Sequence, residues 1–113
     1  MHEYSIVGAL IGRIEELAQE RRANAVHGVF VSIGELSGVE PELLATAYTT
    51  FRERTICERA NLTILRVAAR WNCPECRQEI PRGAILECAR CGVPARLAAG
   101  DEIVLERVEM EVA

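Results

Sequence analysis

The chain has 113 residues and a formal net charge of −4, and 50% of its residues are hydrophobic. This length fits one compact domain, or one domain that carries a small insert, and the apolar fraction is enough to form a core. So acidic a chain is a poor general binder of nucleic acid or of anionic membrane, and we expect neither as a partner. No stretch reaches the ~18 apolar residues of a membrane span, and the first residues lack the basic region of a signal peptide, so we expect a cytoplasmic location.

The first part of the chain predicts a helix followed by a strand. Residues 4–22 are expected to form an amphipathic helix, because apolar residues recur there at helical spacing. The residues of this apolar stripe are Ile6, Val7, Leu10, Ile11, Ile14, Leu17 and Ala18. The pattern alternates over residues 26–36, which indicates a strand with Val29, Val31 and Ile33 on its more apolar face.

A second helix and two further strands are predicted downstream. Pro41 follows a glycine-containing loop and suits the first position of a helix that ends near Arg54. Its predicted inner face consists of Leu43, Leu44, Ala47, Tyr48 and Phe51. Residues 62–71 and 101–112 have strand character. In the second of these strands the residues expected on one face are Val104, Val108, Met110 and Val112.

Between these two strands lie two Cys-x-x-Cys pairs, Cys73 with Cys76 and Cys88 with Cys91, separated by eleven residues. Each pair can direct two sulfurs at one point, so together they supply the four thiolates of a closed, tetrahedral structural Zn²⁺ site. Two redox dithiols, two disulfides or an iron–sulfur cluster are the alternative readings. Four thiolates and one Zn²⁺ would add −2 to the formal charge. The paired motif favours zinc.

The element order, helix–strand–helix–strand–insert–strand, predicts an α+β fold. We expect a small mixed three-stranded sheet with two helices, plus an inserted four-cysteine, zinc-ribbon-like domain. The predicted boundaries are 1–70 with 98–113 for the α/β domain and 71–97 for the zinc-binding domain. The two strands that flank the insert are expected to pair antiparallel, which would place the zinc lobe at the tip of a long hairpin.

The N-terminus offers a second group of metal ligands. The α-amine of Met1, the imidazole of His2 and the intervening backbone nitrogens can form five- and six-membered chelate rings. Such a nitrogen set suits square-planar Ni²⁺ or Cu²⁺ better than Zn²⁺. From the residues alone, an ordinary exposed side chain near a frayed end is the favoured reading of His2, and metal binding is the alternative.

The motifs together resemble one known family. These motifs are Met1-His2-Glu3 at the start, the loop of residues 34–41 (Gly-Glu-Leu-Ser-Gly-Val-Glu-Pro), the paired cysteines, and Gly100-Asp101-Glu102 before an acidic strand. In this order they are similar to the hydrogenase maturation nickel metallochaperones, the HypA/HybF family, over essentially the whole chain. The resemblance implies a nickel-binding α/β domain with a zinc domain. It also implies nickel delivery to the large-subunit precursor of [NiFe]-hydrogenase, and in some organisms to urease through its maturation proteins, together with a HypB-type GTPase.

Transferred residue by residue, the resemblance makes His2 the essential nickel ligand, with the Met1 amine and the backbone nitrogens of His2 and Glu3 completing a plane. It makes the four paired cysteines the zinc ligands. Some family members have a His next to one of the Cys-x-x-Cys pairs. In this chain the residues that follow the two pairs are Arg77 and Gly92. The resemblance therefore does not carry a pH-dependent exchange of zinc ligands over to this chain.

Cys57 is predicted to be a partly buried, inert thiol. His27 is predicted to be a structural or solvated side chain that binds no metal. No nucleophile–base pair or phosphate-binding loop is present, and no enzymatic activity is expected. Two hypotheses follow. The first is a nickel metallochaperone, monomeric or weakly homodimeric, with transient Ni(II) and structural Zn(II). The second is a zinc-ribbon interaction module that binds protein or nucleic acid, although Trp71 lacks the aromatic neighbours of a single-strand platform.

Overall fold

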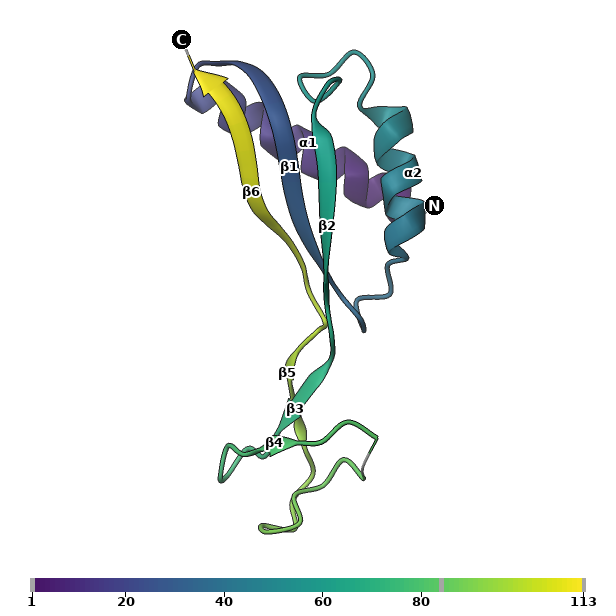
Figure 1. Ribbon diagram of the computed structural model, residues 1–113, viewed down its shortest axis with the longest axis vertical. Coiled ribbons are helices and arrows are strands. Elements are labelled where there is room, and N and C mark those ends of the chain that lie inside the picture. The colour runs from purple at the N-terminus through teal and green to yellow at the C-terminus, as the bar shows by residue number, and fades with distance from the viewer. Residues whose placement is uncertain (1, 84, 113) are drawn as a thin grey trace.

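The computed structural model describes residues 2–83 and 85–112, and these form two lobes along an axis of 56 Å (Figure 1). The elements in chain order are α1 (His2–Glu20), β1 (Ala23–Gly34), α2 (Pro41–Phe51), β2 (Asn61–Val67), β3 (Arg70–Asn72), β4 (Glu79–Ile80), β5 (Arg96–Ala99) and β6 (Ile103–Val112). The predicted α+β class, with a mixed three-stranded sheet, two helices and a zinc-ribbon-like insert, is confirmed. No helix in the described ranges is long and apolar enough to cross a membrane.

The central strand of the larger sheet is β1, which pairs with β2 in parallel and with β6 antiparallel. The prediction that the strands flanking the insert pair with each other is therefore wrong for the body, where β1 separates them. An antiparallel pairing beside the insert does occur in the smaller sheet, but there β3 pairs with β5 and with β4, and not with β6. The reason is that β1 contains the most buried strand residues, and a central position covers both of its edges.

Both helices contribute to one core with the larger sheet. The buried stripe of α1 includes Val7, Ile11 and Ile14, as its periodicity predicts. The second helix begins at Pro41, as predicted, because the missing N–H of proline costs nothing in the first turn. Its predicted inner face is only partly correct. Leu44, Ala47 and Tyr48 are buried, whereas Leu43 and Phe51 are 55% and 46% exposed.

A β-bulge in β6 changes which side chains face this core. Phe30 pairs with Arg107 and Val31 with Leu105, so Glu106 is an extra residue. A bulge switches the alternation of side chains, and the residues that pack on the core are Ile103, Leu105, Val108 and Met110. The predicted face is therefore wrong at Val104, which faces the other side of the sheet beside Ser32. Val112 lies on the same side as Val108 and Met110, although it is 55% exposed.

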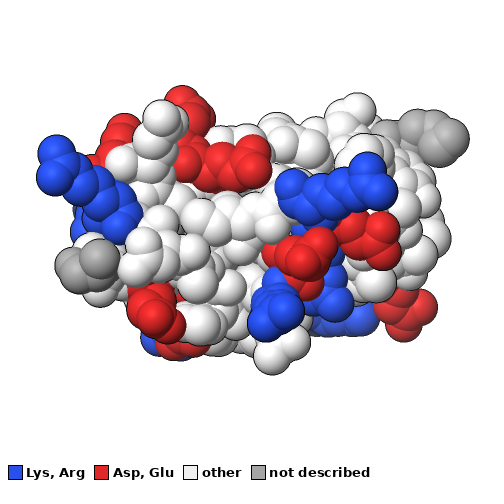
Figure 2. Space-filling view, turned by 90° about the horizontal axis from the view of Figure 1, so that it is seen from above, with Lys and Arg blue, Asp and Glu red and all other residues white. Residues whose placement is uncertain are grey.

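The predicted strand over residues 62–71 is divided into β2 and β3, with a break at Ala68 and Ala69. The break separates two hydrophobic clusters that share no residue. One fills the body, and the other gathers Trp71, Ile80 and Val93 around the paired cysteines. Seen from above the body in Figure 2, basic side chains lie next to acidic ones and do not gather into one positive patch on that face.

Candidate metal sites

The four paired cysteines are presented by two tight turns in the smaller lobe. The first turn closes with the N–H of Arg77 donating to the Cys73 carbonyl at 2.9 Å, and the second with the N–H of Gly92 donating to the Cys88 carbonyl at 2.8 Å. Arg77 and Gly92 both have positive φ, 63° and 69°. Glycine adopts this conformation freely, whereas an arginine there is strained. Each turn thus aims two sulfurs inward.

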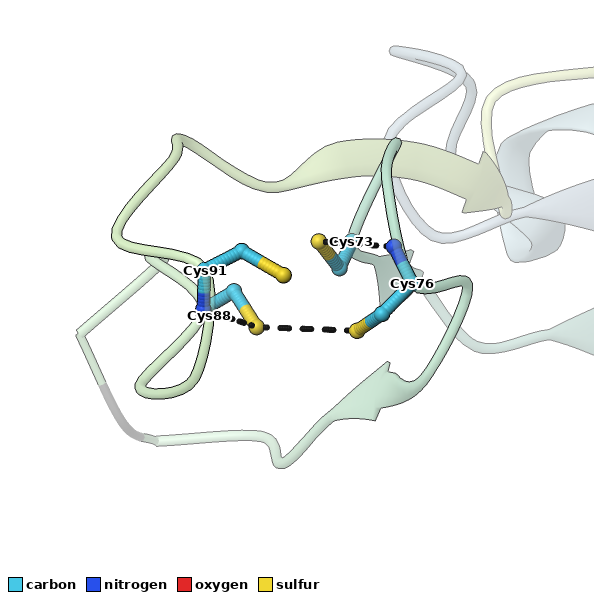
Figure 3. A group of neighbouring side chains, drawn as sticks. All are labelled: Cys73, Cys76, Cys88 and Cys91. Atoms are coloured by element: carbon cyan, nitrogen blue, oxygen red, sulfur yellow. Dashed lines mark hydrogen bonds between the residues drawn. The ribbon is translucent and has the colours of Figure 1, made fainter.

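The sulfurs converge on one point (Figure 3). All four Sγ atoms lie within 4.8 Å of one another, and Cys76 Sγ is 3.7 Å from Cys88 Sγ. Four sulfurs at about 2.3 Å from a tetrahedral Zn²⁺ are about 3.8 Å apart, so the Cys76–Cys88 distance already matches this ion and the whole set is close to its geometry. Cys73 and Cys88 are almost completely buried, which is typical of a closed site. The structure brings together the four residues that the motif predicted.

The electrostatics of the cluster also favour a cation. The N–H groups of Cys76 and Glu75 donate to Cys73 Sγ at 3.4 Å and lower the pKa of that thiol to about 7. Burial and the neighbouring sulfurs raise the pKa of Cys91 to about 12. The first proton therefore leaves easily, whereas the last thiol cannot ionise next to other thiolates unless a positive ion neutralises them.

The predicted nickel ligands lie at the start of α1, in a first turn that contacts the loop before α2 and is separate from the cysteine cluster (Figure 1). His2 is exposed and Glu3 half-buried in the first helical turn, whereas Met1 lies outside the described residues. The Glu3 carboxylate accepts a hydrogen bond from the N–H of Glu40 at 3.3 Å. Hydrogen bonds from the backbone of Glu3 and Glu40 lower the pKa of this carboxyl. The loop before α2 is therefore attached to the N-terminal turn.

The two remaining candidates take no part in either cluster. His27 is exposed, and its Nε2 lies 2.9 Å from Glu111 Oε1 across the β1–β6 ladder. Cys57 is fully buried beneath Tyr48, and burial raises the pKa of its thiol. The buried Cys57 agrees with the predicted inert thiol.

Sequence reasoning gave no specific role to Glu35, which follows β1. Its carboxylate accepts the N–H of Ala69 at 2.9 Å and forms two hydrogen bonds with the Arg82 guanidinium, one of them at 2.7 Å. The guanidinium and the amide lower the pKa of Glu35 to about 2. An acidic residue among glycines carries no periodic signal, so the sequence alone could not connect it with an arginine 47 positions away.

An α/β body with an inserted four-cysteine lobe defines a metal-binding protein with a zinc-ribbon-like site. Residues 1–110 match the family described as hydrogenase/urease nickel incorporation, metallochaperone, hypA. The chain belongs to this HypA family of nickel metallochaperones for hydrogenase maturation.

Two similar relatives and two solved structures agree with this placement. The hydrogenase maturation factor HypA of Aquifex aeolicus is 40% identical, with 99% of each chain covered. That of Shewanella oneidensis is 39% identical and covers 100% of this chain and 98% of its own. A solution structure of HypA protein has a TM-score of 0.82 at 32% identity, covering 100% of this chain and 98% of the other. The Ni metallochaperone HypA of Helicobacter pylori has a TM-score of 0.73 at 31% identity, with 98% of each chain covered.

Proposed function

We propose that this protein binds one Ni²⁺ at its N-terminus and delivers it during the maturation of [NiFe]-hydrogenase, without catalysing a reaction itself. Nickel is the cargo. The ligands are the Met1 amine, the His2 imidazole and the backbone nitrogens of His2 and Glu3. The observation that carries the proposal is that an exposed His2 begins α1, so its imidazole is accessible from solvent.

A helix start suits this chelation for two reasons. The first four N–H groups of an α-helix have no intrahelical acceptor, so metal binding to the first amides breaks no helical hydrogen bond. A five-membered chelate ring also needs a small N–Cα–C–N torsion, and the helical ψ of about −42° is much closer to this than the extended value of about +135°. The helix start thus holds successive nitrogens on one side of the chain.

The helix dipole opposes a free cation at this end, because the N-terminus has partial positive charge. When Ni²⁺ displaces two amide protons, the two negative amidate nitrogens offset this repulsion. Ni²⁺ with two amidate nitrogens is neutral before the carboxylate of Glu3 is counted. Proton release thus makes binding depend on pH, and it permits the metal to leave when the amides are protonated again. A carrier that must hand over its cargo needs this reversibility.

The cysteine lobe is proposed to hold a structural Zn²⁺ through Cys73, Cys76, Cys88 and Cys91, because the closed donor set leaves no open coordination position. The proposed domain limits are 1–70 with 98–113 for the nickel-binding domain and 71–97 for the zinc-binding domain. Four reduced thiolates require a reducing compartment, for which we propose the cytoplasm. The proposed partners are a HypB-type GTPase and the hydrogenase large-subunit precursor, with urease maturation proteins as a second client.

The experiment is a nickel titration of tag-free protein with its native start. Three variants accompany it: His2→Ala, one extra residue before Met1, and His27→Ala as the matched control for an exposed histidine outside the site. We expect a planar, diamagnetic nickel spectrum for the native protein and for His27→Ala, and its loss in the other two. Equal binding by all four proteins would contradict the proposal and favour the zinc-ribbon interaction module.

A further inference from the structure

The two lobes are connected by a narrow crossing of backbone segments. A Cβ atom on Gly34 would lie 2.3 Å from the Gly100 carbonyl oxygen, and one on Gly100 would lie 2.6 Å from Ala69 Cα. The N–H of Gly34 donates to Glu102 at 2.8 Å, and that of Leu36 donates to Gly100 at 2.7 Å. These contacts attach the end of β1 to the connecting segments on the body side. They do not reach into the cysteine lobe.

Apolar packing does not fix the orientation of the lobe. The body and lobe clusters share no residue. Where the two lobes face each other, a hollow of about 390 Å³ is lined by side chains of both, including Leu36 from the body and Trp71 and Leu86 from the lobe. Because space and not packed atoms lies between these side chains, the lobe can swing about the connecting segments without opening either core.

One carboxylate spans this junction. Glu35 Oε1 accepts the N–H of Ala69 at 2.9 Å and the Arg82 Nη1–H at 2.7 Å, while Arg82 Nη2–H donates to Oε2. Arg82 belongs to the cysteine lobe, and its Nη1 also lies 3.4 Å from the Ala69 carbonyl oxygen. Among the described residues, this is the ion pair that joins the larger sheet's side of the molecule, through the loop after β1, to the smaller sheet's side. A bidentate pair of this kind fixes direction as well as distance.

We propose that Glu35 is the residue that sets the orientation of the cysteine lobe relative to the helix–sheet body. Its carboxylate holds a connecting strand at Ala69 and the lobe at Arg82 simultaneously. The side chains of the pair are 39% and 62% exposed, so it adds little to the stability of folding. Its effect is directional. Few other contacts between the lobe and the body fix their relative orientation. A weak bidentate ion pair is therefore enough to select one of several orientations of similar energy. This positioning role does not depend on nickel binding.

The test is the alignment of each lobe in the zinc-loaded, full-length protein, measured by amide residual dipolar couplings. In the native protein the couplings of both lobes fit one alignment tensor. Glu35→Ala is expected to lose this common tensor, so that the lobes report separate alignments. Arg82→Ala is expected to do the same from the other side of the pair, with a smaller effect, because the bond from Ala69 remains. About 1 M salt, which shortens the Debye length to ~3 Å, is expected to weaken the common alignment in the unmodified protein.

Arg70→Ala is the matched control, because it removes a comparably exposed ion pair, with Glu79, that joins two strands of the smaller sheet, β3 and β4. It is expected to keep the common tensor. Arg82→Lys, which retains the charge but not the two-pronged geometry, is expected to restore the alignment only in part. Bound zinc and the chemical shifts within each lobe report that both lobes remain folded. A single unchanged tensor in both Glu35→Ala and Arg82→Ala would overturn the proposal, as would loss of zinc from Arg82→Ala.

Discussion

The backbone N–H of Glu40 donates to Oε2 of Glu3 at 3.3 Å, which joins the loop before α2 to the first turn of α1. Five residues earlier in the same loop, Glu35 contacts Arg82 of the cysteine lobe. One short loop thus touches the proposed nickel site at one end and the cysteine lobe at the other. Its shape is stabilised by Val39, which is buried in the core of the body.

The contact between Glu3 and Glu40 makes a prediction about local protection. Replacing Glu3 by Ala removes the acceptor, so the Glu40 amide should exchange with solvent faster, while the amides of β1 keep their native rates. Hydrogen exchange followed by NMR measures both sets. Glu16→Ala, an exposed acidic change on the same helix, should leave the Glu40 amide unchanged. An unaltered Glu40 rate in Glu3→Ala would show that the bond is not formed in solution.

Zinc removal should affect the two lobes differently. The cysteine lobe owes its organisation to four thiolates around one point, and without the metal their turns lose the constraint. The body has its own buried cluster and should stay folded. Far-UV circular dichroism after chelation should therefore retain most of the helical signal, while amide resonances of residues 71–97 collapse. A complete loss of helical signal would contradict two independent cores.

Two adjacent leucines in α2 test the observed helix face. Leu44 is fully buried and Leu43 is 55% exposed. Leu44→Ala should lower the free energy of unfolding by about 2–5 kcal/mol, because it leaves a cavity in the core. Leu43→Ala should change it by no more than about 0.5 kcal/mol. Urea unfolding of both variants measures the difference. Equal effects would mean that α2 is rotated about its axis relative to the structure, so that both leucines are buried to a similar extent.

The low pKa of Glu35 predicts how its ion pair responds to pH. A carboxyl group whose folded pKa lies below its unfolded value contributes stability above the unfolded value and loses that contribution as pH falls through the folded value. For Glu35 the loss falls between the ordinary 4.5 and about 2. The difference in unfolding midpoint between the native protein and Glu35→Gln should therefore shrink as the pH is lowered from about 5 to about 3. A difference that stays constant over this range would mean that the pKa is not lowered.

Local patterns in the sequence predicted most elements and the cysteine site, because helical spacing, a proline at a helix start and paired cysteines each act over a few residues. The remaining features depend on contacts between distant segments. The central position of β1 depends on the competition for both of its edges, and the bulge at Glu106 is invisible in a strand that alternates regularly on either side of it. Leu43 and Phe51 lie at the margins of the helical stripe, where tertiary packing decides exposure. Phe51 instead lies against Tyr4, with ring centroids 5.1 Å apart.

The most direct measurement is X-ray absorption at the nickel edge on tag-free, zinc-loaded protein that carries one equivalent of Ni²⁺. The proposed nickel site predicts a four-coordinate planar spectrum with four nitrogen neighbours, which disappears in His2→Ala, while the zinc edge keeps four sulfur neighbours. Nickel with sulfur neighbours, and a spectrum that His2→Ala leaves unchanged, would contradict it.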